Sequence, residues 1–344
     1  MPRPRTALRL ADVAERAGVS LATASRALAG RDGVSEQVAD RVRQVSRDLG
    51  YVANLHARTL AGGSTSTVGL IVHQIDDPYF SEIASGVIGA AGEQDLMVQI
   101  CHSARDPQQE LRQIRTLIAQ RIGIIIIAGS GYVHPSLQAE SKAELSAFED
   151  AGGRVAVIGR HFLRADAVLP DNQPAGEAIA DHVLSLGHRR IAVAAGPERL
   201  TTVADRLAGV ASALERRGLS LAALPVVQTD FTRDGGRSAT EEIMREHPQT
   251  TAIIALNDAM AIGVLSVLRS HGVSVPDQMS VVGFDDVSVA ADLAPSLTTV
   301  RLPMAEMGQL ALAMALKPRS SRSRRKSTGH RLIVRDSTGP VPSA

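Results

Sequence analysis

The segment that most constrains this chain lies near its N-terminus, where residues 8–30 read LRLADVAERAGVSLATASRALAG. Apolar residues recur at helical spacing in its first half: Leu10, Val13, Ala14 and Ala17. A Gly-Val-Ser break follows, and the Ser20 hydroxyl can cap a second helix from Leu21 by accepting from a first-turn N–H. Two short helices joined by a glycine-containing turn predict a helix-turn-helix, whose second helix lies in the DNA major groove.

The exposed face of the second helix carries residue types suited to DNA. Arg26 can donate two hydrogen bonds to guanine. Thr23 and Ser25 offer hydroxyls to phosphate oxygens. Leu21 and Ala22 lie at the helix start, where base edges and thymine methyl groups would be met. The alternative is an ordinary helical hairpin with a solvated arginine.

A third helix follows the first two. Ser35 is a predicted N-cap, Glu36 favours the helix dipole, and Gly50 is a predicted stop. The apolar positions between them have helical spacing: Val38, Val42, Val45 and Leu49. The next segment, residues 54–60, is too short for a stable isolated helix in water. It fits either a segment that folds only when docked or a plain linker.

The distribution of charge separates a basic head from an acidic body. Residues 1–62 hold 10 Arg and no Lys against 6 acidic residues, and residues 317–331 hold 7 basic residues and no acid. The remaining chain holds 20 basic against 30 acidic residues. This pattern indicates a DNA-binding module attached to a body that does not bind DNA. The tract from Lys317 to His330 is predicted to be a mobile solvated loop, with a nonspecific DNA contact as the alternative.

From about Thr65 onward, short apolar runs alternate with amphipathic segments. The predicted strands are 68–72, 97–101, 122–128, 155–158, 191–195, 252–256 and 280–284, and predicted helices include 110–121, 175–186 and 206–217. Strands that are apolar on both faces suit a parallel sheet covered by helices on each side. About 280 residues exceed most single cores, so the alternation predicts two doubly wound α/β lobes. A ligand site is expected in the cleft between them.

Polar and aromatic residues follow several of these strands. Carboxylates, an amide and a guanidinium can bind sugar hydroxyls, and aromatic rings can cover a sugar face. The candidates are Asp76, Asp77, Tyr79, Phe80, Arg206 (predicted to open a helix), Phe231, Asn257, Asp258, Asp285 and Asp286. Each acid alone is more commonly a helix cap or a loop charge. The whole chain holds only 8 Phe, Tyr and Trp residues, so three aromatics at such positions strengthen the set.

The N-terminal 72 residues resemble the start of LacI/GalR-family transcriptional regulators, through the run LADVAERAGVSLATASRALAGRDGVSEQVADRVRQVSRDLGYVANLHARTLAGGSTSTVGLIV. The resemblance implies that Leu21, Ala22 and Arg26 read bases. It also implies a hinge helix whose Leu60 wedges a minor-groove base step, with Asn54 and Ala57 beside it. One departure is Ala24, where the family usually has Val; this is predicted to be a core position.

The resemblance extends to near the C-terminus, through PDNQPAGEAIADHVLSLGHRRIAVAAGP (170–197), residues 206–209, IIALNDAMAIGVLSVLRSHGVSVPDQMSVVGFDD (253–286), PSLTTVRLP (295–303) and RLIVRDST (331–338). It implies the fold of periplasmic sugar-binding proteins. The implied effector-site residues are Asp77, Tyr79, Phe80, Arg206, Phe231, Asn257 and Asp285, with Ser130 and Arg160 as weaker candidates. His73 replaces a Pro common in the family. The chain ends a few residues after RLIVRDST, without a further heptad helix, so a homodimer and a roughly palindromic operator are expected.

Together these patterns predict three parts: a helix-turn-helix DNA-binding domain (1–53), a hinge and linker (54–64), and an α/β, two-lobed, periplasmic-binding-protein-like effector and dimerisation domain with doubly wound parallel sheets (65–344). The predicted function is transcriptional repression controlled by a small effector, with a sugar or polyol favoured over a purine because aromatic residues are few. A purine-responsive corepressor-dependent regulator is one alternative. A transport-type solute-binding protein is another, although it would need an export signal and no DNA head.

Other classes of protein are disfavoured by missing motifs. The run Gly129-Ser130-Gly131 does not continue as a dinucleotide fingerprint, and the P-loop, zinc-protease and nucleophile-elbow motifs are absent. No cofactor, metal or catalytic residue is therefore expected. A single cysteine excludes an intramolecular disulfide. With neither a secretory signal nor a membrane-spanning run, a cytoplasmic protein is expected.

Overall fold

The structure is a computed structural model that describes residues 8–28, 32–51, 67–320 and 322–342. It divides into two compact units, residues 1–65 and 66–344. The predicted hinge residues Asn54, Ala57 and Leu60 lie outside the described residues.

Three helices form the N-terminal unit: α1 (Leu10–Ala17), α2 (Leu21–Leu28) and α3 (Glu36–Leu49). The Ser20 hydroxyl accepts from the Thr23 N–H at 3.1 Å, as its predicted capping role requires. Ser35 occupies the N-cap position of α3, but its side chain makes no capping hydrogen bond. Gly50 ends α3 with φ +66°, a left-handed conformation that glycine adopts without steric cost.

The three helices enclose a small core made largely of alanine and valine. Its buried members are Val13, Ala14, Ala17, Ala24, Ala27, Ala39 and Val42, and Val19 and Leu28 pack against them half-buried. Ala24 is fully buried, so the departure from the family's usual valine affects packing, as predicted. A core of this size contributes little stability by itself.

The first lobe of the second unit is a six-stranded sheet with strand order β11-β5-β4-β3-β1-β2. Its strands are β1 (Thr67–Val72), β2 (Met97–His102), β3 (Ile124–Ala128), β4 (Arg154–Ile158), β5 (Asp166–Leu169) and β11 (Arg325–Ser327). Every described pairing in it is parallel. Its helices are α5 (Pro78–Gly92), α6 (Pro107–Ala119), α7 (Ala139–Asp150) and α12 (Met304–Leu316), with a short 3₁₀ turn η1 (Pro135–Gln138).

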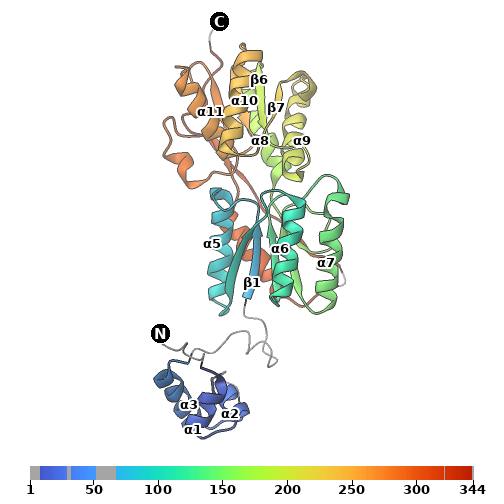
Figure 1. The fold of residues 1–344 in the computed structure, drawn as a ribbon. Helices are drawn as coiled ribbons and strands as arrows, with labels where there is room; N and C mark the ends of the chain where they lie inside the picture. Colours follow the sequence, from blue (N-terminus) through green and yellow to red (C-terminus); the bar gives the residue numbers. More distant parts are fainter. Residues whose placement is uncertain (1–7, 29–31, 52–66, 321, 343–344) are drawn as a thin grey trace, which may run out of the picture. The chain divides into compact units, whose positions relative to one another are not determined.

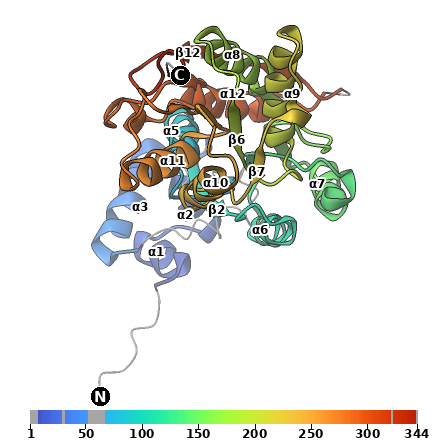
Figure 2. The ribbon, with the colours of Figure 1, turned by 90° about the horizontal axis from the view of Figure 1, so that it is seen from above.

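The second lobe is a four-stranded parallel sheet with strand order β7-β6-β8-β9. Its strands are β6 (Ile191–Ala195), β7 (Val226–Gln228), β8 (Ala252–Ala255) and β9 (Ser280–Val282). Its helices are α8 (Asn172–Ser185), α9 (Thr201–Arg216), α10 (Arg233–Glu246) and α11 (Asp258–Ser270), with 3₁₀ turns η2 (Leu221–Ala223) and η3 (Ser288–Ala291). In Figures 1 and 2, α8 lies beside α9 and α10 beside α11.

The chain passes between the lobes three times, after β5, after β10 (Thr299–Arg301) and before β12 (Arg331–Ile333). Strands β10 and β12 pair antiparallel, and Thr298 bridges to Val282 at the end of β9. Helix α12 therefore comes from the C-terminal region yet packs on α5, β4 and β5 of the first lobe. Because each lobe contains distant parts of the chain, neither lobe is a continuous segment.

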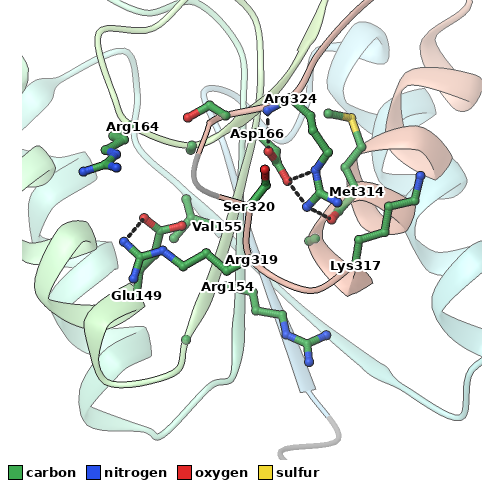
Figure 3. Close-up of a pocket in the computed structure, with 14 residues that line it drawn as sticks. Glu149, Arg154, Val155, Arg164, Asp166, Met314, Lys317, Arg319, Ser320 and Arg324 are labelled. Atoms are coloured by element: carbon green, nitrogen blue, oxygen red, sulfur yellow. Dashed lines mark hydrogen bonds and ion pairs between the residues drawn. The ribbon is translucent and has the colours of Figure 1, made fainter.

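The structure corrects two local predictions. The basic tract is not a mobile loop throughout, because residues 325–327 form β11 and pair with β5. Figure 3 shows the Arg324 guanidinium bound to the Asp166 carboxylate at this edge. Helix α9 begins at Thr201, so Arg206 lies in its second turn and does not open it. The predicted parallel strands otherwise recur within a few residues of their expected bounds, and none of the described helices has the length and hydropathy that a membrane crossing requires.

Candidate functional site: a helix face and an interlobe cleft

Helix α2 presents a consistent outer face in the N-terminal unit. Leu21, Ala22 and Arg26 are exposed, whereas Ala24 and Ala27 on the opposite side are buried. The exposed fraction of Leu21 is 54%, which is high for a large apolar side chain and is explained if it meets a partner. Arg26 has no carboxylate within 4.0 Å among the described residues, so its guanidinium can bind an external acceptor.

The two hydroxyl candidates on α2 differ in their contacts. The Thr23 hydroxyl lies 2.8 Å from the Ser20 hydroxyl, so the end of the turn and the helix start are joined by side chains as well as backbone. Ser25 is half-buried. Thr23 is therefore partly engaged in the cap, whereas Arg26 projects without a partner from the described chain.

The second candidate site is a chamber between the lobes of the larger unit. Eight of the nine predicted effector-site residues line it, together with seven others. The predicted eight are Asp77, Tyr79, Phe80, Ser130, Arg206, Phe231, Asn257 and Asp285, and the others are His73, Arg105, Gly129, Gly159, Pro170, Leu200 and Thr202. The chamber lies at the carboxyl ends of the parallel strands, where ligands of such sheets bind.

Arg206 is the central polar group of the chamber. Its side chain is only 2% exposed and donates to Asp285 Oδ1 at 2.7 Å and to Asn172 Oδ1 at 3.0 Å. It also donates to the Leu256 carbonyl oxygen, and its guanidinium stacks on the Phe284 ring at 3.6 Å. Burial acts to raise the pKa of Asp285, whereas the Arg206 guanidinium at 2.7 Å acts to lower it and favours the carboxylate. The pair thus holds compensating charges in a site shielded from water.

Two other polar residues of the chamber are helix caps as well. Asp77 caps α5 by accepting from the Tyr79 N–H at 3.1 Å, and Asn257 caps α11 by accepting from the Met260 N–H at 2.8 Å. The Asn257 amide also donates to the Phe231 carbonyl oxygen at 3.3 Å. Burial raises the pKa of Asp77, and the Arg105 guanidinium lowers it. For Asp77 and Asn257, a role as a helix cap is therefore compatible with a role in binding a ligand.

Arg105 is the charged chamber residue that sequence reasoning missed. It follows β2, is 7% exposed, and donates to Gln74 Oε1 at 2.7 Å and Asp77 Oδ2 at 3.4 Å. Its guanidinium lies 5.9 Å from the ring centre of Phe80 in the first lobe and 5.7 Å from that of Phe231 in the second. A cation between two aromatic rings connects the lobes across the cleft. Its position shortly after a strand is the one signal in the sequence that could have identified Arg105 as a site residue.

Ser130 and Arg160 contact α9 of the second lobe. The Ser130 hydroxyl accepts from the Thr202 N–H at 3.0 Å. Arg160 does not line the chamber; its guanidinium pairs with Asp205 at 2.6 Å. Both contacts connect the two lobes next to the chamber, so the lobes are held together in this structure.

His73 also lines the chamber. It is 1% exposed, its ring lies 5.7 Å from that of Phe80, and its Nε2 atom has no hydrogen-bond partner in the described residues. Burial holds its pKa well below the usual value, so the ring is neutral. A neutral imidazole can donate or accept a hydrogen bond from a ligand.

The chamber is small, and a larger cleft adjoins it. The chamber encloses about 30 Å³, room for a few water molecules at most, whereas the outer cleft encloses about 280 Å³. Asp77, Arg105 and Phe231 line both spaces. Hydroxyl-binding groups therefore surround the chamber, and Arg105 with Phe231 stands between it and the outer cleft. No group of three metal-binding side chains occurs among the residues that the structure describes.

Comparison with protein families matches two parts of the chain. Residues 9–54 match the model described as bacterial regulatory proteins, lacI family, and residues 180–338 match a periplasmic binding protein-like domain. The chain is 32% identical over 341 residues to the HTH-type transcriptional regulator DegA of Bacillus subtilis, covering 96% of this chain and 98% of the relative.

Two solved structures resemble the whole chain or its larger unit. A transcriptional regulator CelR–cellobiose complex is 28% identical, with a TM-score of 0.70, covering 96% of this chain and 99% of that one. A LacI family transcriptional regulator from Enterococcus faecium with bound ribose is 26% identical, with a TM-score of 0.71, covering 80% of this chain and 99% of that one.

Proposed function

Because the chain belongs to the lacI family of bacterial regulatory proteins, we propose that a sugar or polyol bound between its two lobes sets its affinity for operator DNA. The chain is a DNA-binding transcriptional regulator. We propose that it acts as a repressor and that it binds a roughly palindromic operator as a cytoplasmic homodimer. No catalytic role is assigned. The observation that carries the effector assignment is the buried Arg206–Asp285 pair facing a chamber that also holds Asn257 and Asp77.

The chemistry of the chamber favours a neutral polyhydroxyl ligand. Two guanidiniums, of Arg105 and Arg206, are matched there by two carboxylates, of Asp77 and Asp285. Guanidiniums donate to hydroxyl oxygens and carboxylates accept from hydroxyl hydrogens, while aromatic rings can cover the apolar face of a sugar. The relatives of known structure were solved with cellobiose and with ribose, which agrees with this class.

The proposed regulation works through the lobes. Because the chamber has room for only a few waters, a sugar ring enters when the lobes separate and is then enclosed. This movement changes the position of the first lobe, which follows the DNA-binding unit in the chain. We propose that the effector lowers operator affinity in this way, with Leu21, Ala22, Thr23, Ser25 and Arg26 at the major groove and Asn54, Ala57 and Leu60 at the minor groove.

The test begins with thermal unfolding of the purified protein against sugars, polyols, sugar phosphates and nucleosides. A ligand at a hundredfold excess over its Kd stabilises by about 2.7 kcal/mol, a clear shift. A nucleoside hit would favour the purine-responsive alternative, since that interpretation expects flat ring ligands. Calorimetry then measures the affinity of the hit.

The matched variants are Asp285→Asn and Asp286→Asn. Asp285→Asn keeps the shape of the side chain but removes its charge at the chamber, so effector affinity is expected to fall at least tenfold, about 1.4 kcal/mol. Asp286 binds Arg301 and Arg335 and does not line the chamber, so its variant keeps effector binding. Equal affinity in both variants would contradict the site assignment, and operator binding by Asp285→Asn shows that the DNA-binding unit is intact.

A further inference from the structure

The proposed function leaves the basic tract without a role, although the structure orders most of it. Two of its cations are neutralised within the first lobe. Arg319 pairs with Asp150 at 2.9 Å and Arg324 with Asp166. These pairs and the β11–β5 ladder hold the tract against the lobe.

Other cations of this region have no such partner. The set consists of Arg164, Lys317, Arg322, Arg325 and Lys326, which we name the basic edge. All five are exposed, and in the part of the chain that the structure describes none has a carboxylate within 4.0 Å. Unpaired exposed cations repel one another, so this arrangement costs stability unless an anion binds to it.

A small pocket of about 30 Å³ lies beside the basic edge, between the end of α12 and the start of β4. Figure 3 shows the end groups of Arg164 and Lys317 lying away from the Glu149 and Asp166 carboxylates. Ser320 and Ser323 line the same pocket. Hydroxyls combined with lysine and arginine form the usual side-chain set for phosphate oxygens.

Arg164 and Lys317 line the pocket beside Arg154, at the amino end of β4. The tract then runs up the outer strand of the first sheet, where the register puts Arg325 and Lys326 level with the last two residues of β1. Arg154 starts β4 opposite Ile124, and Ile124 lies opposite Val68 near the start of β1. Two strand spacings separate Arg154 from Val68, about 10 Å. The chain arrives from the DNA-binding unit just before Thr67, at this same end of the sheet. The effector chamber lies at the opposite, carboxyl end.

We propose that the basic edge contacts phosphates of DNA that flanks the operator. The proposal rests on operator binding, which brings a polyanion to this protein. Four of the five charges follow one another along the tract, and Arg164 lies with Lys317 at the pocket. They do not converge on one buried point, and this arrangement suits a row of phosphates better than a single small anion. Such contacts add affinity and salt dependence without reading bases.

The experiment compares two duplexes, using an operator selected from a random library. One duplex contains the operator alone and the other extends about two helical turns beyond each end. The slope of log K against log salt is expected to be steeper on the long duplex. Arg322→Gln/Lys326→Gln should remove this excess, with the slope falling by about 0.9 for each phosphate that the protein no longer neutralises. Neither side chain makes a described hydrogen bond, so folding is preserved.

Arg217→Gln/Arg269→Gln is the matched control, because it removes two exposed cations of the second lobe that also lack carboxylate partners among the described residues. This control should retain the excess slope. Equal wild-type slopes on both duplexes would overturn the proposal. The proposal would also be overturned if inorganic phosphate, titrated at fixed ionic strength, gave a binding heat that Arg322→Gln/Lys326→Gln abolishes while the slopes on the two duplexes stay equal. The basic edge would then bind a free anion. Loss of binding to the short duplex would count against the operator function and not against the basic edge.

Discussion

At the residue scale, buried ionisable groups divide into those that are paired and those that are not. Arg206 and Asp285 compensate each other, and removing only one partner would leave a buried charge at a cost of about 3–5 kcal/mol. Glu110 has no such cation among the residues that the structure describes. It is fully buried, accepts from the Gln138 amide at 3.4 Å, and its Oε2 atom has no hydrogen-bond partner in the described residues.

Glu110 should make stability depend on pH. Burial raises its pKa from 4.5 to about 7, so the folded protein retains a proton that the unfolded chain releases. Its contribution is fully present below pH 4.5 and is lost as the pH rises through about 7. In Glu110→Gln, which stays neutral, the free energy of unfolding should therefore gain roughly 3 kcal/mol over the wild type between these limits.

Chemical denaturation at a series of pH values measures this difference. Subtracting the two profiles cancels the opposite contribution of buried histidines such as His161, whose pKa burial lowers to about 4. A constant difference between wild type and variant from pH 4.5 to 7 would show that Glu110 is ionised throughout or is reached by water.

At the element scale, glycines let helices approach to backbone contact. A Cβ at Gly86 of α5 would overlap the Ala305 carbonyl oxygen of α12, and one at Gly308 of α12 would overlap the Ile83 carbonyl oxygen of α5. The same reciprocal arrangement joins α8 to α9 and α10 to α11. Helix α12 is thus fastened to the first lobe although it comes from the other end of the chain.

Two alanine substitutions one turn apart on α5 should have opposite effects. Gly86→Ala forces α5 and α12 apart and should lower the free energy of unfolding by about 1–3 kcal/mol. At Gly89 an added Cβ meets nothing within 4 Å, so Gly89→Ala should raise it by about 0.5–1 kcal/mol through helix propensity. Equilibrium unfolding at one protein concentration measures both, and equal effects of the two substitutions would refute the close-packing account.

At the scale of the whole molecule, contacts across the cleft connect the two lobes. On one side Arg160 pairs with Asp205, and on the other Arg105 stacks on Phe231. Because the chain also crosses three times, the lobes can hinge and still stay connected. A bound effector can therefore bias one arrangement over another by its differential contacts.

Removal of the proposed wedge should separate specific from nonspecific DNA binding. Leu60→Ala removes the side chain assigned to the minor groove, so operator affinity should fall by an order of magnitude or more, about 1.4 kcal/mol per tenfold. Affinity for a scrambled duplex should stay the same. Titration of both duplexes gives the ratio, and calorimetry with effector serves as the control for an intact larger unit. An unchanged ratio would remove Leu60 from the interface.

Most of the chamber residues could be predicted from the sequence, but the limits of the chamber could not. Asp77, Asn257 and Asp285 were recognisable because each comes within a few residues after a strand, and the carboxyl ends of parallel strands meet at one edge. Arg160 met the same positional test, yet it pairs with Asp205 outside the chamber. Position after a strand indicates the edge of the sheet on which a residue lies, and not the partner that its side chain selects.

Local patterns in the sequence determined the elements of this protein: the helix-turn-helix, its Ser20 cap, and the alternation of parallel strands with helices. These depend on periodicity and capping, which act over a few residues. Only the tertiary structure decided that Arg105 lies between Phe80 and Phe231, that α12 joins the first lobe, and that part of the basic tract becomes an edge strand. Each of these depends on contacts between segments far apart in the chain, and such contacts leave no periodic trace in either segment.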